Sequence, residues 1–238
     1  MNTISQLEIS EIVECAKKVL PLSSAKLSEE YFYQSLPLCI IDAIFSIGVK
    51  YDSTREVVIR YCNHTSQRRI RTDIDFPPQS EQESISLFCA RPEQSNLDSM
   101  AKCVYQNRQR TSTRSGILKA EAVLQFAKVL QTFGVEYFQD LSKVINDPKF
   151  GSDLREIPGQ KSGISIQYFW MLAGSESFVK PDRMVIRFLE NVLTRKIKSV
   201  EEAAVLLQSA SGHLSKDFQN MNARLLDHEV WKYQRAVK

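Results

Sequence analysis

The spacing of apolar residues is the feature that most restricts the folds open to this chain of 238 residues. Within MVIRFLENVL, residues 184–193, the apolar positions follow one another at i, i+1, i+4, i+5, i+8 and i+9, which is the period of one helix face. The segment ILKAEAVLQFAKVLQTFG repeats this spacing and ends at Gly134, a typical residue after a helix. No pair of alternating apolar strands joined by a turn is found. The sequence therefore predicts an all-α protein.

Further helices are expected from the same spacing, at about 7–20, 28–35, 38–47, 53–62, 82–90, 97–106, 135–145, 162–173, 199–211 and 217–235. Two polar segments separate them. Pro77-Pro78 lies within a polar stretch that predicts a loop between subregions, and residues 106–116 predict an exposed basic loop.

Composition narrows the class of protein. With 43% hydrophobic residues the chain can bury a substantial core, and no apolar run approaches the roughly 18 residues that span a membrane. The first 20 residues carry acids before their apolar positions, unlike a secretory signal, so we expect a cytoplasmic protein, nucleoid-associated if bacterial. The five cysteines are scattered without a C-x-x-C pair, and the three histidines are dispersed. We therefore expect no metal site and no cofactor.

The net charge of +3 is unevenly distributed. Residues 99–120 contain five basic residues and no acid, and residues 180–198 contain six basic residues against Asp182 and Glu190. Such segments are typical of a surface that faces a polyanion, but solvated helix faces would give the same pattern. Charge alone leaves both readings open.

The segment LREIPGQKSGIS predicts two short helices joined by a turn. Leu154 and Ile157 form the buried pair of the first helix, and Pro158 ends it. Gly159 permits a tight backbone turn, and Ser162 is the expected cap of the next helix, ISIQYFWML. Backbone N–H groups at the start of that helix would form an anion site suited to a phosphate.

This pattern resembles the helix-hairpin-helix motif of the helix-hairpin-helix DNA glycosylase superfamily, which contains endonuclease III-like, alkyladenine and 8-oxoguanine enzymes. The match consists of an apolar pair, Pro-Gly and a small residue, followed by an Asp-x-x-Val-x-Arg block: Leu154, Ile157, Pro158, Gly159, Ser165, Asp182, Val185 and Arg187. A weaker likeness extends over residues 35–235. The resemblance implies a two-lobed, all-α glycosylase-like unit over 1–238. One lobe would lie mainly within 35–150, and the hairpin and catalytic-acid lobe would combine 151–238 with the N-terminal helices.

Three departures from the family pattern bear on mechanism. Lys161 replaces the second glycine of the hairpin, where it could contact phosphate. Gly163 stands where members with lyase activity carry a catalytic lysine, and no cysteine follows Cys103, so the iron–sulfur cluster of the endonuclease III branch is missing. The resemblance therefore implies a monofunctional enzyme that forms no Schiff base.

By this resemblance, Asp182 is the catalytic residue. A carboxylate beside the deoxyribose can stabilise its developing positive charge and activate water, and the start of its own helix favours the ionised form. An aspartate after a loop is also a common helix cap, and both roles are compatible.

The resemblance also implies other site residues. Tyr51 follows the segment PLCIIDAIFSIGVK, where the family inserts a wedge into the base stack. Tyr31, Tyr33 and Tyr168 are candidates for the base pocket, although aromatic residues at helical spacing are more often core. Arg187 is expected to make a structural ion pair rather than a DNA contact. The remaining expected DNA contacts are Gly159, Gln160, Lys161, Ser162, Gly163, Arg108, Arg110 and Arg114.

The predicted function is that of a DNA glycosylase that flips a damaged or modified base out of double-stranded DNA and hydrolyses its N-glycosidic bond. Its role would be base excision repair or, as a variant, removal of hypermodified bases from foreign DNA. We expect a monomer that does not associate with a membrane. Two alternatives stay open: a non-catalytic helix-hairpin-helix DNA-binding protein and an all-α protein-interaction module. The sequence does not indicate which base is removed.

Overall fold

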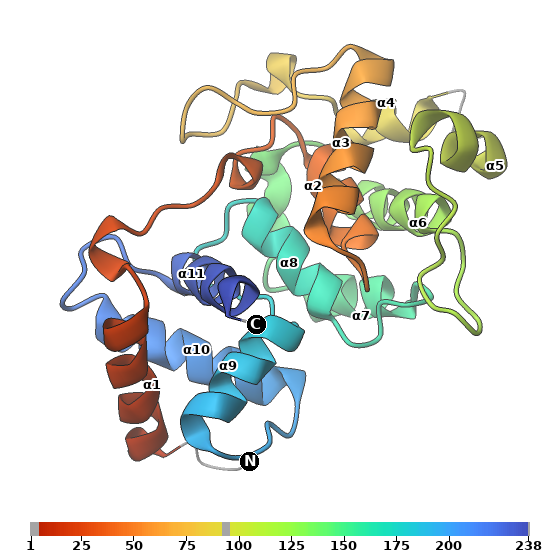
Figure 1. Ribbon diagram of the computed structural model, residues 1–238. Helices are drawn as coiled ribbons and strands as arrows, with labels where there is room; N and C mark the ends of the chain where they lie inside the picture. Colours follow the sequence, from red (N-terminus) through yellow and green to blue (C-terminus); the bar gives the residue numbers. More distant parts are fainter. Residues whose placement is uncertain (1–4, 92–95, 238) are drawn as a thin grey trace. The chain divides into compact units, whose positions relative to one another are not determined.

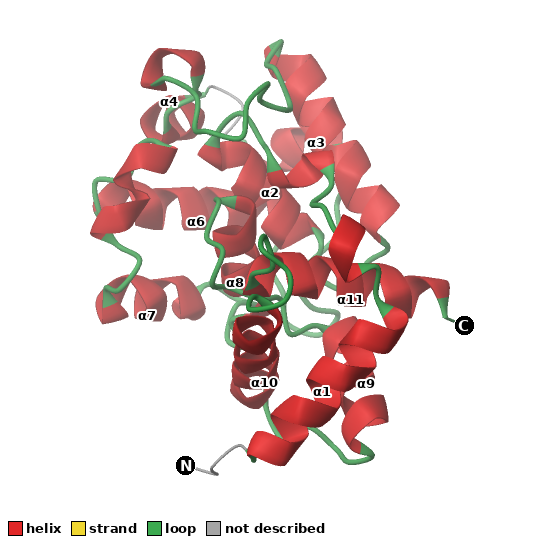
Figure 2. Cartoon of the chain, turned by 90° about the vertical axis from the view of Figure 1, so that its left-hand side faces the viewer, coloured by secondary structure: helices red, strands yellow, loops and turns green. Residues whose placement is uncertain are grey.

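The computed structural model describes residues 5–91 and 96–237, and its regular elements are helices joined by loops (Figures 1 and 2). Within these ranges no strand forms, and β pairing is limited to two isolated bridges, Tyr33 with Ile70 and Arg110 with Leu118. The all-α prediction is confirmed. None of the helices in the described ranges is long and apolar enough to cross a membrane.

The chain divides into two compact units. Unit 1 combines Met1–Ser28 with Gly174–Lys238, and unit 2 is the intervening segment Glu29–Ala173. The predicted lobe boundary near residue 151 differs from this division. Two helices after it, α7 (Pro148–Glu156) and α8 (Ile164–Leu172), pack against α6 (Lys119–Thr132) and α2 (Leu36–Phe45) of unit 2. The predicted ranges also include residues 1–4, 92–95 and 238, which lie outside the described residues.

Unit 1 is a bundle of four α-helices: α1 (Gln6–Val19), α9 (Arg183–Leu193), α10 (Val200–Leu214) and α11 (Ala223–Ala236). Helix α1 packs on α9 and α10, and α11 packs on the same two helices (Figure 1). A capping box starts α1. The Ser5 side chain accepts from a backbone N–H of the first turn, and the Glu8 side chain accepts from the Ser5 N–H. The core is drawn from all four helices and includes Ile12, Val185, Phe188, Leu206 and Leu226. Unit 1 also contains the 3-10 turn η1 (Leu22–Ser24).

Unit 2 is organised around α2 (Leu36–Phe45), whose ten residues are all buried. Three helices pack on it: α3 (Tyr51–Thr65), α6 (Lys119–Thr132) and α8 (Ile164–Leu172). The remaining elements are η2 (Glu29–Tyr31), η3 (Gln79–Glu81), α4 (Ile85–Ala90), α5 (Leu97–Ser99), η5 (Met100–Val104), η6 (Phe138–Lys143) and α7 (Pro148–Glu156).

The buried Lys119 ties the end of α2 to the segment before α6. Its Nζ donates to the carbonyl oxygens of Phe45 (3.0 Å) and Ile47 (2.7 Å) and to Gln109 Oε1 (3.1 Å). A cation at the C-terminal end of a helix is favourable because the last carbonyls lack helical partners. Burial nevertheless lowers the pKa of Lys119 to about 8.

Three expected helices take other forms. The predicted helix at 28–35 is reduced to the 3-10 turn η2, and that at 135–145 is the 3-10 helix η6. The predicted helix at 97–106 begins as the short α5 and continues as η5, a π-helix. In the π-helix Tyr105 N–H donates to the Met100 carbonyl, one residue further back than in an α-helix.

Candidate functional site

The predicted hairpin is present in unit 2 as α7, a seven-residue turn and α8. Gly159 and Gly163 have φ angles of +95° and +73°, which other residues adopt only with strain. Two backbone hydrogen bonds hold the turn, from Gln160 N–H to the Ile157 carbonyl and from Gly163 N–H to the Gln160 carbonyl, both 2.9 Å. Leu154 and Ile157 are buried, as the pattern predicted.

The first turn of α8 has no side-chain cap. The helix starts after Gly163, not after Ser162 as predicted, and Gly163 has no side chain that could accept from the first N–H groups. The first N–H with a helical acceptor is that of Gln167, which donates to the Gly163 carbonyl. The N–H groups of Ile164, Ser165 and Ile166 precede it and receive no side-chain cap from Gly163.

Two basic residues, Lys161 and Arg155, lie on or beside this turn. Lys161 and Ser162 are exposed on the turn. A Cβ placed on Gly163 would lie 3.2 Å from the Arg155 guanidinium, so Arg155 sits directly beside the turn. Sequence reasoning did not select Arg155, because helical spacing alone does not show that it returns to Gly163. A lysine at position 163 would combine a strained backbone with contact to this cation.

The basic loop at 106–116 packs against the same turn. A Cβ placed on Gly159 would lie 2.5 Å from Thr111 Cβ, so only glycine permits this approach. Thr111 N–H donates to the Ile117 carbonyl (2.9 Å), which folds the loop back on itself. Two segments that were predicted independently to contact DNA therefore adjoin each other in unit 2.

The three arginines of the loop differ in their partners. Arg108 forms an ion pair with Asp98 (2.7 Å), and Arg110 Nη1 donates to the Gly116 carbonyl (2.7 Å). Arg114 is exposed and makes no hydrogen bond or ion pair within the described residues. Arg114 is therefore the loop arginine with an unengaged guanidinium.

Gln160 is buried, and its side chain stabilises the turn. Its Oε1 accepts from the Ser165 hydroxyl, while its Nε2 has no hydrogen-bond partner among the described residues. The prediction that Gln160 contacts DNA is corrected on this point, because a buried side chain cannot reach an external backbone. Gln160 instead fixes the shape of the turn.

Asp182 lies in unit 1 as the N-cap of α9. Its Oδ1 accepts from the N–H groups of Met184 (2.7 Å) and Val185 (3.3 Å), and the residue is partly exposed. The capping role that the sequence suggested for this residue is thus present. Neither N–H bond involves Oδ2.

A second carboxyl group, Asp227 of α11, is coupled to Asp182. Asp227 is buried and its Oδ2 accepts from the Lys180 N–H (2.7 Å), two residues before Asp182. Burial first, and the negative charge of Asp182 second, raise the pKa of Asp227 well above its ordinary value. The arrangement pairs a partly exposed carboxyl with a buried one that favours its neutral form. Nothing in the spacing of ARLLDHEV identified Asp227.

Arg187 has a structural role, as expected, although its partner is not an acid. Its Nε donates to Gln234 Oε1 (2.8 Å) and its Nη2 to the Gln234 carbonyl (2.7 Å), joining α9 to α11.

The tyrosines predicted for the base pocket and the wedge converge within unit 2. The buried Asp42 of α2 accepts from the hydroxyls of Tyr33 (2.8 Å) and Tyr168 (3.5 Å). Charge interactions with Tyr31 and Tyr51 place these residues in the same cluster. Burial raises the pKa of Tyr33, Tyr51 and Tyr168.

The cluster is closed, which favours the alternative that the tyrosines are core residues. Tyr33 is fully buried and Tyr31 and Tyr168 nearly so. The Tyr51 hydroxyl is also buried, so the prediction that Tyr51 is an inserted wedge is corrected. The lone acid in the apolar segment LPLCIIDAIF was the only sequence signal for this cluster.

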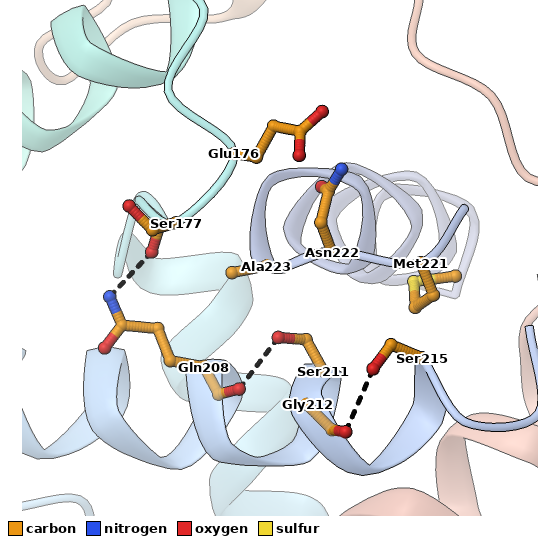
Figure 3. Close-up of a pocket in the computed structure, with 9 residues that line it drawn as sticks. All are labelled: Glu176, Ser177, Gln208, Ser211, Gly212, Ser215, Met221, Asn222 and Ala223. Carbon is orange, nitrogen blue, oxygen red and sulfur yellow. Dashed lines mark hydrogen bonds between the residues drawn. The ribbon is translucent and has the colours of Figure 1, made fainter. Parts of the chain in front are cut away.

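Two surface hollows lie away from these residues. In unit 1, a hollow of about 470 Å³ is lined by α10 and the start of α11, where Ser211 and Ser215 donate to helix carbonyls and Gln208 donates to the Ser177 carbonyl (Figure 3). In unit 2, a hollow of about 330 Å³ lies between α3 and η5. No group of three or more potential metal ligands occurs within residues 5–91 and 96–237.

Comparison with known proteins gives a family and no function. No curated protein and no solved structure matches the chain. A family model described as a domain of unknown function (DUF8548) matches residues 10–235. Since this match covers both units, the chain belongs to that family.

Proposed function

We propose that the protein is a monofunctional DNA glycosylase that removes a damaged or modified base from double-stranded DNA. The observation that carries the proposal is the hairpin turn, where two glycines with positive φ leave the start of α8 without a side-chain cap. Backbone N–H groups at such a helix start bind phosphate oxygens. Lys161, Arg155 and the adjoining loop supply the positive charge that a DNA backbone requires.

The chemistry is assigned to Asp182. Water adds to C1′ of the flipped nucleotide as the bond to the base breaks, the electron pair of that bond leaves with the base, and the proton of the water passes to the Asp182 carboxylate. The same carboxylate stabilises the positive charge that develops on the sugar. Oδ1 is engaged by two N–H groups, so Oδ2 is the oxygen assigned to these roles.

The monofunctional assignment follows from Gly163. In the family that the chain resembles, members with lyase activity carry their Schiff-base lysine at this position, whereas here it is a glycine with a positive φ and the Arg155 guanidinium close by. The reaction therefore ends at an abasic site.

A second candidate function is DNA binding without catalysis. It is favoured by the two hydrogen bonds that Asp182 accepts from the N–H groups of its own helix, since these account for the residue without any reaction. Under this alternative the hairpin and the loop keep their roles.

The deciding experiment incubates the full chain with duplexes that each carry one modified base, followed by hot alkali to cleave abasic sites. Release of at least one base, with strand cleavage only after alkali, is the expected result. Release of no base across alkylated, deaminated, oxidised and hypermodified substrates, with binding retained, would leave the non-catalytic alternative. Cleavage without alkali would contradict the monofunctional assignment.

A further inference from the structure

The hollow between α3 and η5 in unit 2 carries a distinct binding chemistry. Its polar lining consists of Arg60, Asn63, His64 and Gln106, together with the Cys103 thiol, and contains no carboxylate. Arginine, histidine and amide side chains can all donate to a phosphate, and arginine does so with a planar pair of N–H groups. A lining that offers hydrogen-bond donors and contains no carboxylate is complementary to an anion.

The Arg60 guanidinium is held in place but not neutralised. Its Nη1 donates to the Tyr105 carbonyl (3.2 Å), which fixes the side chain against η5. Across the described part of the chain it forms no ion pair and no other hydrogen bond, so its remaining N–H donors are available. An arginine positioned by a neutral carbonyl retains its full charge for a ligand.

The backbone beside the hollow departs from regular geometry. Met100–Val104 forms a π-helix, and Gln106 has a φ of +48°, one of three positive values at residues other than glycine in the described ranges. Both features carry a cost in stability and are frequent at functional sites. Together they set Cys103, Val104 and Gln106 against α3.

We propose that this hollow is a binding site for a phosphate group. It stands apart from the base-release reaction, because it needs neither Asp182 nor the hairpin turn. Gln106 also begins the basic loop that packs on Gly159, so a DNA backbone phosphate is one source of the ligand and a free phosphate or phosphomonoester is the other.

Cys103 reports on occupancy of the hollow because it is exposed and lines it. The full chain is treated with iodoacetamide in the presence of inorganic phosphate or of an undamaged DNA duplex, and alkylation of Cys103 is followed by mass spectrometry. Alkylation of Cys15, in unit 1, provides the internal reference. Protection by inorganic phosphate identifies a free phosphate ligand, whereas protection by the duplex alone identifies a backbone phosphate.

Variants connect protection to the hollow itself. Arg60→Gln should raise the half-protecting concentration of the effective probe about tenfold, because a charge-assisted contact is lost. Asn63→Asp places an acid in the lining, three residues after Arg60 on α3, where it repels an anion and can pair with the guanidinium, and it should have a similar effect. Arg68→Gln is the matched control, since Arg68 is exposed in unit 2 and does not line the hollow.

Two results would overturn the proposal. One is that neither probe slows alkylation of Cys103 in the parent protein. The other is that protection persists unchanged in both Arg60→Gln and Asn63→Asp, which would assign it to DNA lying over the surface. Neither result depends on whether any base is released.

Discussion

The first turns of α8 and α9 differ in whether a side chain accepts from their backbone N–H groups. Each helix begins with backbone N–H groups that lack helical partners. At α9 the carboxylate of Asp182 accepts from two of them, whereas at α8 the cap is Gly163, which has no side chain. One helix start is closed by the chain's own acid, and the other is left open beside Lys161 and Arg155.

Under the proposed function, this difference separates two tasks, the binding of a phosphate and the placement of a carboxylate. In that proposal, the helix start without a side-chain cap binds an anion supplied by the ligand, while the capped one holds the Asp182 carboxylate in a fixed position. Five substitutions, each compared with the parent protein or a control variant, test the two sides of the comparison.

The largest effect is expected from Asp182→Asn. Asparagine caps a helix about as well as aspartate, so α9 should form as before, while the charge and the proton acceptor are lost. Base release should fall by about 100-fold to 10,000-fold, measured under single-turnover conditions.

Asp147→Asn is the matched control for this change. Asp147 caps α7 with nearly the same geometry, since its Oδ1 accepts from Lys149 N–H (2.8 Å) and Phe150 N–H (3.3 Å). Base release should be unchanged in this variant. If Asp182→Asn were as active as the parent, Asp182 would serve only as a helix cap, and the start of α9 would have no role in the reaction.

The next largest effect is expected from Gly159→Ala. The added Cβ would meet Thr111 at 2.5 Å on a backbone with a φ of +95°, so the free energy of unfolding should fall by about 2 to 4 kcal/mol. Urea denaturation measures the change.

Gly134→Ala isolates the contact with Thr111. Gly134 has a φ of +69° but nothing within 4 Å of an added Cβ, so this variant should lose only about 1 kcal/mol. If the two variants were equally stable, the loop would not be packed on the hairpin as described.

Asp227→Asn tests the buried acid behind the closed helix start. Because the folded-state pKa of Asp227 is raised, the native state retains its proton where the unfolded chain has lost it. The stability contribution is complete below the ordinary carboxyl pKa and is lost as the pH rises toward the folded value, with a slope of about 1.4 kcal/mol per pH unit.

Removing the titrating group should therefore flatten the pH dependence of stability above pH 4 and make the variant the more stable protein at neutral pH. The amide oxygen of asparagine can still accept from Lys180 N–H, which preserves the loop. Denaturation curves from pH 4 to 8 measure both effects. If stability had the same pH dependence in variant and parent, burial would not raise the pKa of Asp227 in the folded protein.

The smallest effect is expected from single charges at the open helix start. Lys161→Gln and Arg155→Gln should each weaken duplex binding by a fewfold and lower the slope of log affinity against log salt by about one. Lys128→Gln, an exposed position on α6 of the same unit, should leave the slope unchanged. If all three variants gave the same slope, the open start of α8 would not be a phosphate site.

Much of the helical architecture was predictable from the sequence because apolar spacing reports which face of a helix is buried. The segments that became α6 and α9 show this, as does the buried pair Leu154 and Ile157. The prediction failed where local hydrogen bonding overrides spacing, as in η5, whose apolar pattern fits an α-helix and whose backbone is a π-helix.

The site was predictable only in its local parts. Pro158-Gly159 identified the turn, but the choice of Gly163 over Ser162 as the cap depends on a left-handed φ that serine tolerates poorly. Asp42 and Asp227 were missed because their partners arrive from distant segments, 126 residues away in the case of Tyr168. Packing of this kind is set by the tertiary fold and leaves no periodic trace in the sequence.

The interleaved order of the two units has a consequence for the biosynthesis of the protein. The ribosome makes α1 before its packing partner α9, which begins 164 positions after α1 ends. At a translation rate of roughly 5 to 20 residues per second, α9 follows α1 after roughly 8 to 30 seconds. Until then, α9 cannot cover the apolar side chains of Ile9, Ile12 and Val13. Unit 2 is contiguous and is complete at residue 173, so we expect it to fold while the first helix is still unpartnered. The nascent chain thus leaves the apolar face of α1 uncovered throughout the synthesis of unit 2, and we expect chaperones to bind this face during that time.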